Sequence, residues 1–161
     1  MENLREPKQI VTSLFHVGAV VSDLAESIRV FEDSFGFKKV SQRSVDHDYI
    51  GQLIGVPGIS AEIAMLDIGD GIFLELIVWH GSVKHSLSEL KSDLSSRSIQ
   101  HLCIYVDDAD FWYAKLSSEP AIKIVSKNPL TIPIGPNMGS KDFFALVLDE
   151  IYVEIFERIK K

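Results

Sequence analysis

The sequence has few of the features that mark secreted or membrane-bound proteins. Its 161 residues include a single cysteine, Cys103, which excludes an intrachain disulfide and favours a reducing, cytoplasmic location. The longest apolar run, 72–79, is interrupted by Glu75 and is far shorter than the ~20 residues that cross a bilayer. The polar segment 1–9 has no apolar stretch behind it, so we expect no signal peptide.

The sequence also lacks an excess of positive charge. It has 16 Lys and Arg against 23 Asp and Glu, a net charge of −7, and the acidic residues are spread along the chain. Such a surface repels phosphate groups, so we expect neither nucleic acid nor an anionic membrane as a partner. With 46% hydrophobic residues, the chain is long enough to bury a core.

An internal repeat is the most informative feature that is present. An offset of 85 (101 − 16) pairs His16 with His101 and Asp23 with Asp108. The last apolar segments of the two units align at an offset of 79 (154 − 75), which pairs Glu75 with Glu154. A duplication of this length predicts that the chain is built from two similar structural units.

Each unit begins with an apolar, β-branched segment followed by an acidic helix cap, a helical stripe and three further extended segments. This order predicts an α+β fold of two βαβββ modules at 12–80 and 98–157, joined by a serine-rich linker at 81–97. Because neither module can cover its own sheet, we expect the two to pair, within one chain or between two chains.

Two histidines and two glutamates are the candidate functional residues. Each module opens with a histidine on its first strand and closes with a glutamate inside an apolar last strand: His16, Glu75, His101 and Glu154. A buried carboxylate needs a cation, a hydrogen-bond donor or a raised pKa. Taken singly, each histidine is better explained as a core residue, and each glutamate could reach solvent at a sheet edge. Because the pattern occurs twice in register, we predict instead that all four bind one metal.

The chemistry of this ligand set points to a catalytic metal. Two imidazoles and two carboxylates leave positions open on a six-coordinate Zn, Ni, Co, Mn or Fe ion, where a substrate can bind. Cys103 lies two residues beyond His101 and therefore on the same strand face, but a buried cysteine is more commonly a small apolar filler.

These residues resemble the vicinal oxygen chelate superfamily, which includes glyoxalase I, bleomycin-resistance proteins and extradiol dioxygenases. The resemblance spans 14–157 and is carried by an opening His-x-x-x-x-Val-x-Asp motif from His16, the Gly55-Val56-Pro57-Gly58 segment, the Gly135-Pro136-Asn137 loop and the two glutamate strands. It implies a curled, barrel-like mixed sheet with outer helices, and a glyoxalase-like metal set of His16, Glu75, His101 and Glu154.

Two departures from that family pattern are visible. Gly18-Ala19-Val20 stands where glyoxalase I sequences usually carry an arginine that binds glutathione, which argues against glutathione as a cosubstrate. The turn before the last glutamate is Val147-Leu148-Asp149-Glu150, without the proline and glycine typical of the family.

The sequence therefore favours a metal-dependent lyase or isomerase that abstracts a proton beside a metal-bound carbonyl, with Glu75 or Glu154 as the catalytic base. An Fe(II) extradiol-type dioxygenase using two histidines and one glutamate is the first alternative. A small-molecule binding or resistance protein without catalysis is the second. We expect a small-molecule substrate, one divalent metal per site and a homodimer.

Overall fold

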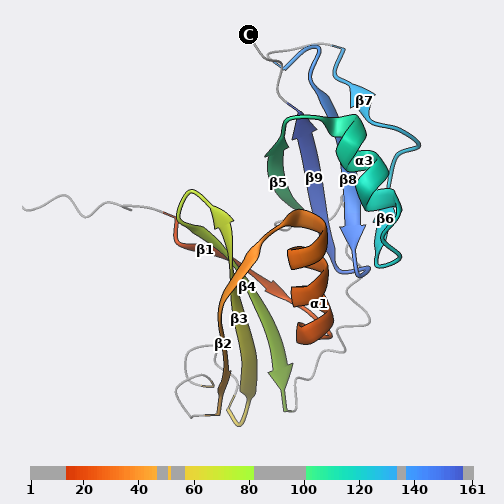
Figure 1. Cartoon of the computed structure of the whole chain (residues 1–161). Helices are drawn as coiled ribbons and strands as arrows, with labels where there is room; N and C mark the ends of the chain where they lie inside the picture. Colours follow the sequence, from red (N-terminus) through yellow and green to blue (C-terminus); the bar gives the residue numbers. More distant parts are fainter. Residues whose placement is uncertain (1–13, 47–50, 52–56, 82–100, 134–136, 158–161) are drawn as a thin grey trace, which may run out of the picture.

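The computed structural model describes residues 14–46, 51, 57–81, 101–133 and 137–157, which form two groups of elements (Figure 1). The first group contains β1 (His16–Val20), α1 (Leu24–Val30), a π-helical turn η1 (Phe31–Phe35), β2 (Lys38–Val45), β3 (Ser60–Gly69) and β4 (Ile72–His80). The second contains β5 (His101–Val106), α3 (Ala109–Ser117), β6 (Ile122–Ile124), β7 (Leu130–Thr131), β8 (Lys141–Val147) and β9 (Ile151–Glu157).

The two βαβββ modules are confirmed, with β7 as a short strand that the sequence did not predict. The predicted linker, 81–97, lies outside the described residues apart from Gly81. Its bounds, and those of the modules, stay a prediction.

The helices begin at the acidic residues that the sequence marks as caps. The Asp23 side chain accepts a hydrogen bond from the Glu26 backbone N–H, and Asp108 accepts one from that of Phe111. Gly36 ends the first helical segment with a φ of 75°, a conformation that favours glycine. Among the described residues, no helix is long and apolar enough to cross a membrane.

The strands form two separate mixed sheets. The first has the order β1-β4-β3-β2, and the second has β5-β9-β8-β6, with β7 paired to β8. In each module the first strand runs parallel to the last, which requires the helical crossover that connects β1 to β2 and β5 to β6. The predicted mixed sheet is therefore made of two sheets that are not closed into a barrel, because β1 and β5 each pair on one side only among the described strands.

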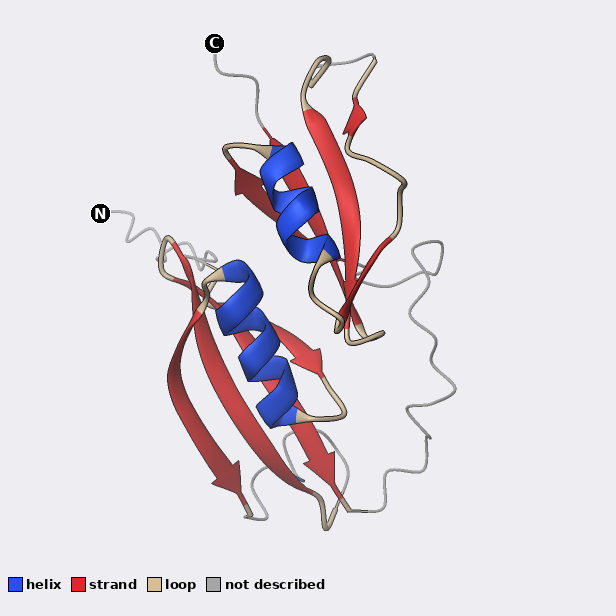
Figure 2. Cartoon of the chain, turned by 45° about the vertical axis from the view of Figure 1, so that its right-hand side comes forward, coloured by secondary structure: helices blue, strands red, loops and turns tan. Residues whose placement is uncertain are grey.

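Each sheet has one face packed against its own helix (Figure 2). On β4 this face carries Leu74 and Leu76, and on β9 it carries Val153 and Ile155, all fully buried. Because side chains alternate along a strand, Glu75 and Glu154 project from the opposite face. The alternation explains how a carboxylate can lie inside an apolar strand. The helices and sheets together confirm the α+β class predicted from the sequence.

The turn between β8 and β9 has the tight geometry that places the last strand. Leu148 and Asp149 have φ values of 53° and 61°, and the Glu150 N–H donates to the Val147 carbonyl at 2.9 Å. The connection from Val147 to Ile151 has three residues, and the first two, both with positive φ, lie at the centre of a turn closed by the Glu150 N–H. Positive φ values at these two places are typical of turns that match the twist of hairpin strands. The β8–β9 hairpin therefore forms although its turn lacks the proline and glycine that are typical of the family.

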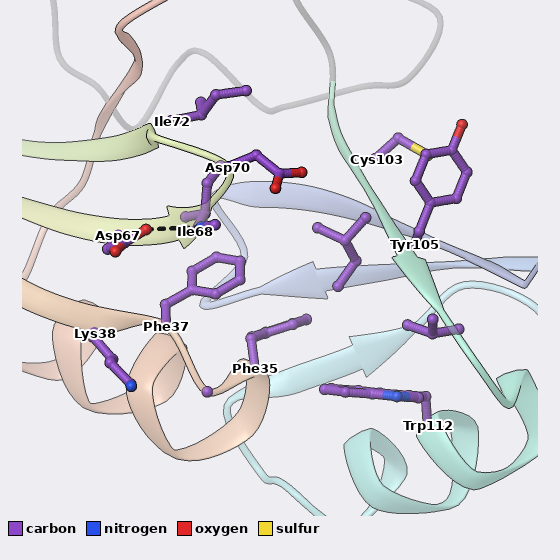
Figure 3. A pocket seen from close by; sticks show the side chains of 14 residues that line it. Phe35, Phe37, Lys38, Asp67, Ile68, Asp70, Ile72, Cys103, Tyr105 and Trp112 are labelled. Atoms are coloured by element: carbon purple, nitrogen blue, oxygen red, sulfur yellow. Dashed lines mark hydrogen bonds between the residues drawn. The ribbon is translucent and has the colours of Figure 1, made fainter.

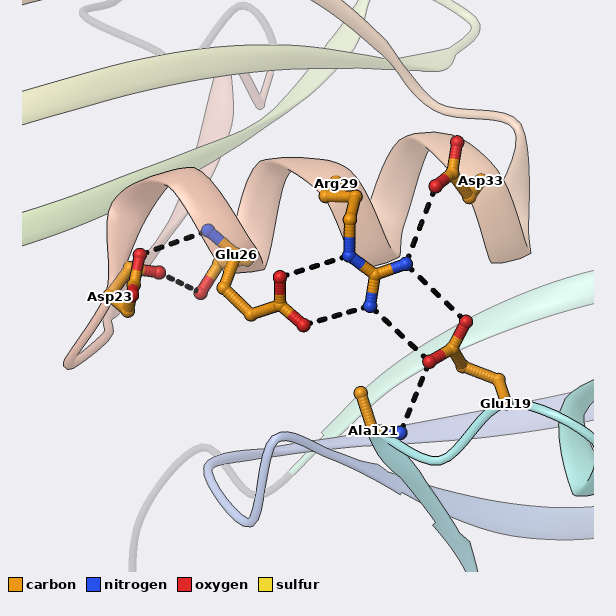
Figure 4. A network of polar contacts seen from close by, with 7 residues as sticks. Asp23, Glu26, Arg29, Asp33, Glu119 and Ala121 are labelled. Carbon is orange, nitrogen blue, oxygen red and sulfur yellow. Dashed lines mark hydrogen bonds and ion pairs between the residues drawn. The ribbon is translucent and has the colours of Figure 1, made fainter.

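The two modules meet through an aromatic contact and a polar network. Phe35 of η1 stacks on Trp112 of α3, with ring centroids 6.3 Å apart, and both belong to a core that includes residues of each module. Arg29 of α1 is held by Glu26 at 2.8 Å and reaches Glu119 of the second module at 3.3 Å (Figure 4). Glu26 and Glu119 raise the pKa of Arg29, so it stays charged.

The aromatic contact between the modules should contribute measurably to stability. We expect Trp112→Ala to lower the free energy of unfolding by about 2 kcal/mol, because it removes a large, half-buried ring from the seam. The neighbouring Phe111 is 61% exposed, so Phe111→Ala should change stability by less than about 0.5 kcal/mol. Urea denaturation followed by circular dichroism measures the free energy of unfolding of both variants. Equal losses in Trp112→Ala and Phe111→Ala would contradict a stabilising role for the Phe35–Trp112 contact.

Candidate metal site

Each module brings one of its histidines next to one of its glutamates. On the first sheet, β1 and β4 pair so that His16 is opposite Phe73 and Gly18 is opposite Glu75. His16 and Glu75 are therefore diagonal neighbours, and His16 Nε2 lies 3.3 Å from Glu75 Oε2. Long side chains on adjacent strands reach each other across such a diagonal.

The second sheet repeats this geometry. Here β5 and β9 pair so that His101 is opposite Tyr152 and Cys103 is opposite Glu154. His101 Nε2 lies 3.1 Å from Glu154 Oε2. The repeat that is visible in the sequence therefore corresponds to a repeated side-chain arrangement.

The spacing within each pair suits two ligands of one cation. Ligand atoms at about 2.1 Å from a metal and at right angles to each other lie about 3.0 Å apart. The observed separations are 3.3 and 3.1 Å. The side chains are half-buried, with 36% and 37% of the histidines and 16% and 17% of the glutamates exposed, so an ion could still reach them. We call His16 with Glu75 the first half-site, and His101 with Glu154 the second half-site.

The two half-sites do not combine within the chain as described. Among the described residues, no group of three or more His, Cys, Asp or Glu side chains lies close enough together to hold a metal ion. The structure thus brings the four predicted ligands together in pairs and not as a set of four. That all four bind one metal stays a prediction.

The first histidine has an orphaned nitrogen. His16 Nδ1 is buried and makes no hydrogen bond within the described structure, whereas Nε2 faces Glu75. The Phe15 ring packs edge-on against the His16 ring at 5.1 Å. The imidazole is therefore oriented by packing and by Glu75, with Nε2 as the nitrogen directed at the candidate site.

The second half-site has two neighbours, the thiol of Cys103 and the carboxyl group of Asp142, that the sequence did not assign to the site. Cys103 is exposed as a residue, so it is not the buried filler that the sequence favoured. Partial desolvation of its thiol first, then the Glu154 charge and a hydrogen bond to Glu154, raise the pKa of this thiol to about 12. Burial and the Glu154 charge also raise the pKa of Asp142. Asp142 lies two residues before Phe144 on β8, so both side chains project from the same face of the sheet. This alternation was the one signal in the sequence that could have placed Asp142 near Glu154.

A cavity of about 640 Å³ lies at the seam between the modules. None of the four predicted ligands lines it, although Cys103, which is opposite Glu154, does. Phe35, Phe37 and Trp112 form one side, and Cys103 and Tyr105 of β5 form another (Figure 3). Asp67 and Asp70 line the polar end. No pattern in the sequence indicated this cavity, because it forms where the β3–β4 turn meets a strand of the other module.

A family model matches most of the chain. The model of the Glyoxalase/Bleomycin resistance protein/Dioxygenase superfamily covers residues 13–127. No curated protein sequence matches the chain.

Solved structures share the fold at low sequence identity. A glyoxalase family protein from Bacillus cereus has a TM-score of 0.81 and 17% identity, and the alignment covers 97% of this chain and 100% of that one. Glyoxalase I from Zea mays has a TM-score of 0.62 and 20% identity, over 92% of this chain and 45% of the maize protein. The fosfomycin resistance protein FosX from Listeria monocytogenes, solved with Mn(II) and sulfate, has a TM-score of 0.55 and 10% identity, over 93% and 95%. At these identities, the likeness shows a shared fold.

The raised pKa of Cys103 leads to a test of the second half-site. We expect iodoacetamide to alkylate this thiol at about pH 8 far more slowly than a small-molecule thiol, because so little thiolate is present. Glu154→Gln removes a negative charge beside the thiol, so it should lower the pKa and speed alkylation. Asp142→Asn should have a smaller effect, since Asp142 is the last of the causes. Mass spectrometry across a pH series gives the alkylation rates. A wild-type Cys103 that reacts as fast as a small-molecule thiol would contradict its contact with Glu154.

Proposed function

The chain belongs to the Glyoxalase/Bleomycin resistance protein/Dioxygenase superfamily, and on this premise we propose that it is a metal-dependent lyase or isomerase of glyoxalase type. The substrate is a small molecule with a carbonyl group. The observation that carries the proposal is the pair of His–Glu contacts at 3.3 and 3.1 Å, each at the spacing of neighbouring metal ligands.

The proposed ligands are His16, Glu75, His101 and Glu154. Imidazole nitrogens and carboxylate oxygens suit Zn, Ni, Co, Mn or Fe, and four such ligands leave positions for substrate oxygen. When bound, the metal would polarise the carbonyl oxygen of the substrate and stabilise negative charge there.

The protein's own part in the reaction is proton transfer. Glu75 or Glu154 takes a proton from the carbon next to the carbonyl, while the electron pair of that C–H bond stays on the substrate. If the carbon that loses the proton also carries a hydroxyl group, the same carboxylate then gives the proton to the former carbonyl carbon while the hydroxyl proton passes to the former carbonyl oxygen. The carbonyl and hydroxyl groups thereby exchange places, and no oxidant or further reactant is needed. The half-buried position of both glutamates keeps the carboxylate close to the substrate and limits competing water.

A homodimer would complete the site. Each chain carries two half-sites on separate sheets, and β1 and β5, which hold the histidines, are the outermost strands of those sheets. We propose that the first half-site of one copy combines with the second half-site of the other, giving two metal sites per dimer. A small substrate then binds between the two sheets.

Metal content tests the ligand assignment. We expect the purified protein to retain close to one divalent metal per chain, as measured by elemental analysis. His16→Ala and Glu154→Ala should each weaken binding by at least the roughly 10- to 100-fold that loss of an outer-shell partner costs, because each removes one ligand.

His80→Ala is the matched control for the metal experiment. His80 Nε2 lies 3.0 Å from Glu62 Oε1, so it makes the same kind of contact on the same sheet but is not one of the proposed ligands. Its loss should leave metal content unchanged. Equal metal content in all variants, or the absence of metal from the wild type, would contradict the assignment.

Mixing two inactive variants tests whether the site is shared between chains. His16→Ala damages only the first half-site, and His101→Ala only the second. In a dimer that holds one copy of each, one site carries both substitutions and the other carries none. Co-expression should therefore restore metal binding to about half of the sites in the mixed dimer, whereas sites built within single chains would regain nothing.

A further inference from the structure

The cavity between the modules has the size of a binding site for a small organic molecule. Its volume of about 640 Å³ lies within the range of roughly 300–1,000 Å³ that such sites occupy. Residues of both modules line it, and none of the four proposed metal ligands does. A molecule held here would therefore contact both modules and would not be a ligand of the proposed metal.

Most of the cavity wall is apolar. The apolar side chains that line it include those of Phe35, Phe37, Ile72, Ile104, Val106 and Trp112. Phe35 and Phe37 are each only 8% exposed, so their rings are held in place by the core against which Trp112 also packs. Such a wall favours a ligand with an apolar body, because binding removes apolar surface of both partners from water.

The charge inside the cavity is negative. Among the described residues, the charged ones that line it are Lys38, Asp67 and Asp70. Lys38 is opposite Asp67 in the register of β2 and β3, so these two charges offset each other. Figure 3 shows the Lys38 side chain on the far side of Phe37, and the Asp70 carboxylate directed across the cavity toward β5. A ligand in the cavity therefore meets the charge of Asp70.

Asp70 is also the carboxylate that is available to a ligand. Oδ1 of Asp67 accepts a hydrogen bond from the Gly69 N–H at 2.8 Å, whereas Asp70 makes no hydrogen bond or ion pair within the described structure. The φ of Asp70 is 54°, a conformation that aspartate and asparagine adopt more readily than most other residues with a side chain. Asparagine at this position would therefore keep the turn and remove the charge.

We propose that this cavity binds a small organic amine, with its ammonium group beside Asp70 and its apolar body against Phe37 of the first module and Ile104 and Val106 of the second. This site is separate from the proposed metal site and does not depend on the proposed function. Because the ligand contacts both modules, its binding stabilises the folded chain in which they are packed together.

Calorimetric titration of the full chain with three ligands of similar shape tests the charge preference. The ligands are the cation phenethylamine, the neutral phenethyl alcohol and the anion phenylpropionate. We expect saturable binding of phenethylamine, weaker binding of the alcohol and the weakest binding of the anion, because only the cation is attracted to Asp70. Phenethylamine should also raise the Tm as its concentration increases. Equal affinities for the three ligands, or no saturable binding of phenethylamine, would overturn the proposal.

A pair of charge variants tests the role of Asp70. Asp70→Asn should raise the Kd of phenethylamine by roughly three- to fivefold, as expected for an ion pair that is open to water, and should leave that of phenethyl alcohol unchanged. Asp46→Asn is the matched control, because it removes the same charge at the opposite end of β2 from Lys38. It should change neither Kd. Equal effects of the two variants on phenethylamine would show that only the net charge of the chain matters, and would overturn the role of Asp70.

A second pair of variants tests the location of the ligand. Ile72 is half-buried and lines the cavity, so Ile72→Phe adds volume to the open space. We expect it to raise the Kd of phenethylamine and of phenethyl alcohol by roughly tenfold or more through steric overlap. Ile72→Val, which leaves the space open, should bind both nearly as the wild type does. Circular dichroism checks that both variants fold, and an unchanged Kd in folded Ile72→Phe would place the amine elsewhere.

Removal of metal separates this site from the proposed metal site. An amine nitrogen can itself coordinate a metal, so the titration is repeated after treatment of the protein with EDTA. We expect the Kd of phenethylamine to be unchanged. Loss of binding after this treatment would place the amine on the metal, which would overturn this inference and leave the proposed function intact.

Discussion

The parallel pairing of the first and last strands in each module is the constraint on which the site depends. Parallel neighbours cannot be joined by a tight turn, so a helix crosses over and covers one face of the sheet. The register of β1 with β4, and of β5 with β9, then places a histidine and a glutamate diagonally on the other face. A slip of one residue in either pairing would turn the glutamate into the helix-packed core.

The same constraint divides the ligands into two pairs. Because each histidine lies beside a glutamate of its own module, each module alone supplies half of the proposed metal-binding set, at a spacing that suits two ligands. The modules contact each other elsewhere, through Phe35 with Trp112 and Arg29 with Glu119. The packing that joins the modules in one chain therefore does not bring their half-sites together, which is why a second copy enters the proposed function.

Duplication gave the modules a common plan, and later differences give them different chemical surroundings. Gly18 and Cys103 occupy equivalent places beside the two glutamates, as do Met65 and Phe144 on the other side. The two glutamates therefore have different neighbours, although their side chains are exposed to nearly the same extent, 16% for Glu75 and 17% for Glu154. Unequal surroundings allow two identical carboxylates to act differently.

The sequence by itself determined the repeat, the helix caps at Asp23 and Asp108, the glycine at the helix end and the residues on each strand face, because these follow from local chemistry and from alternation along a strand. Only the tertiary structure decided that the strands form two sheets and that His16 meets Glu75 while His101 meets Glu154. Strand register and module packing depend on contacts between residues far apart in the chain, such as Phe35 with Trp112, and no local pattern encodes them.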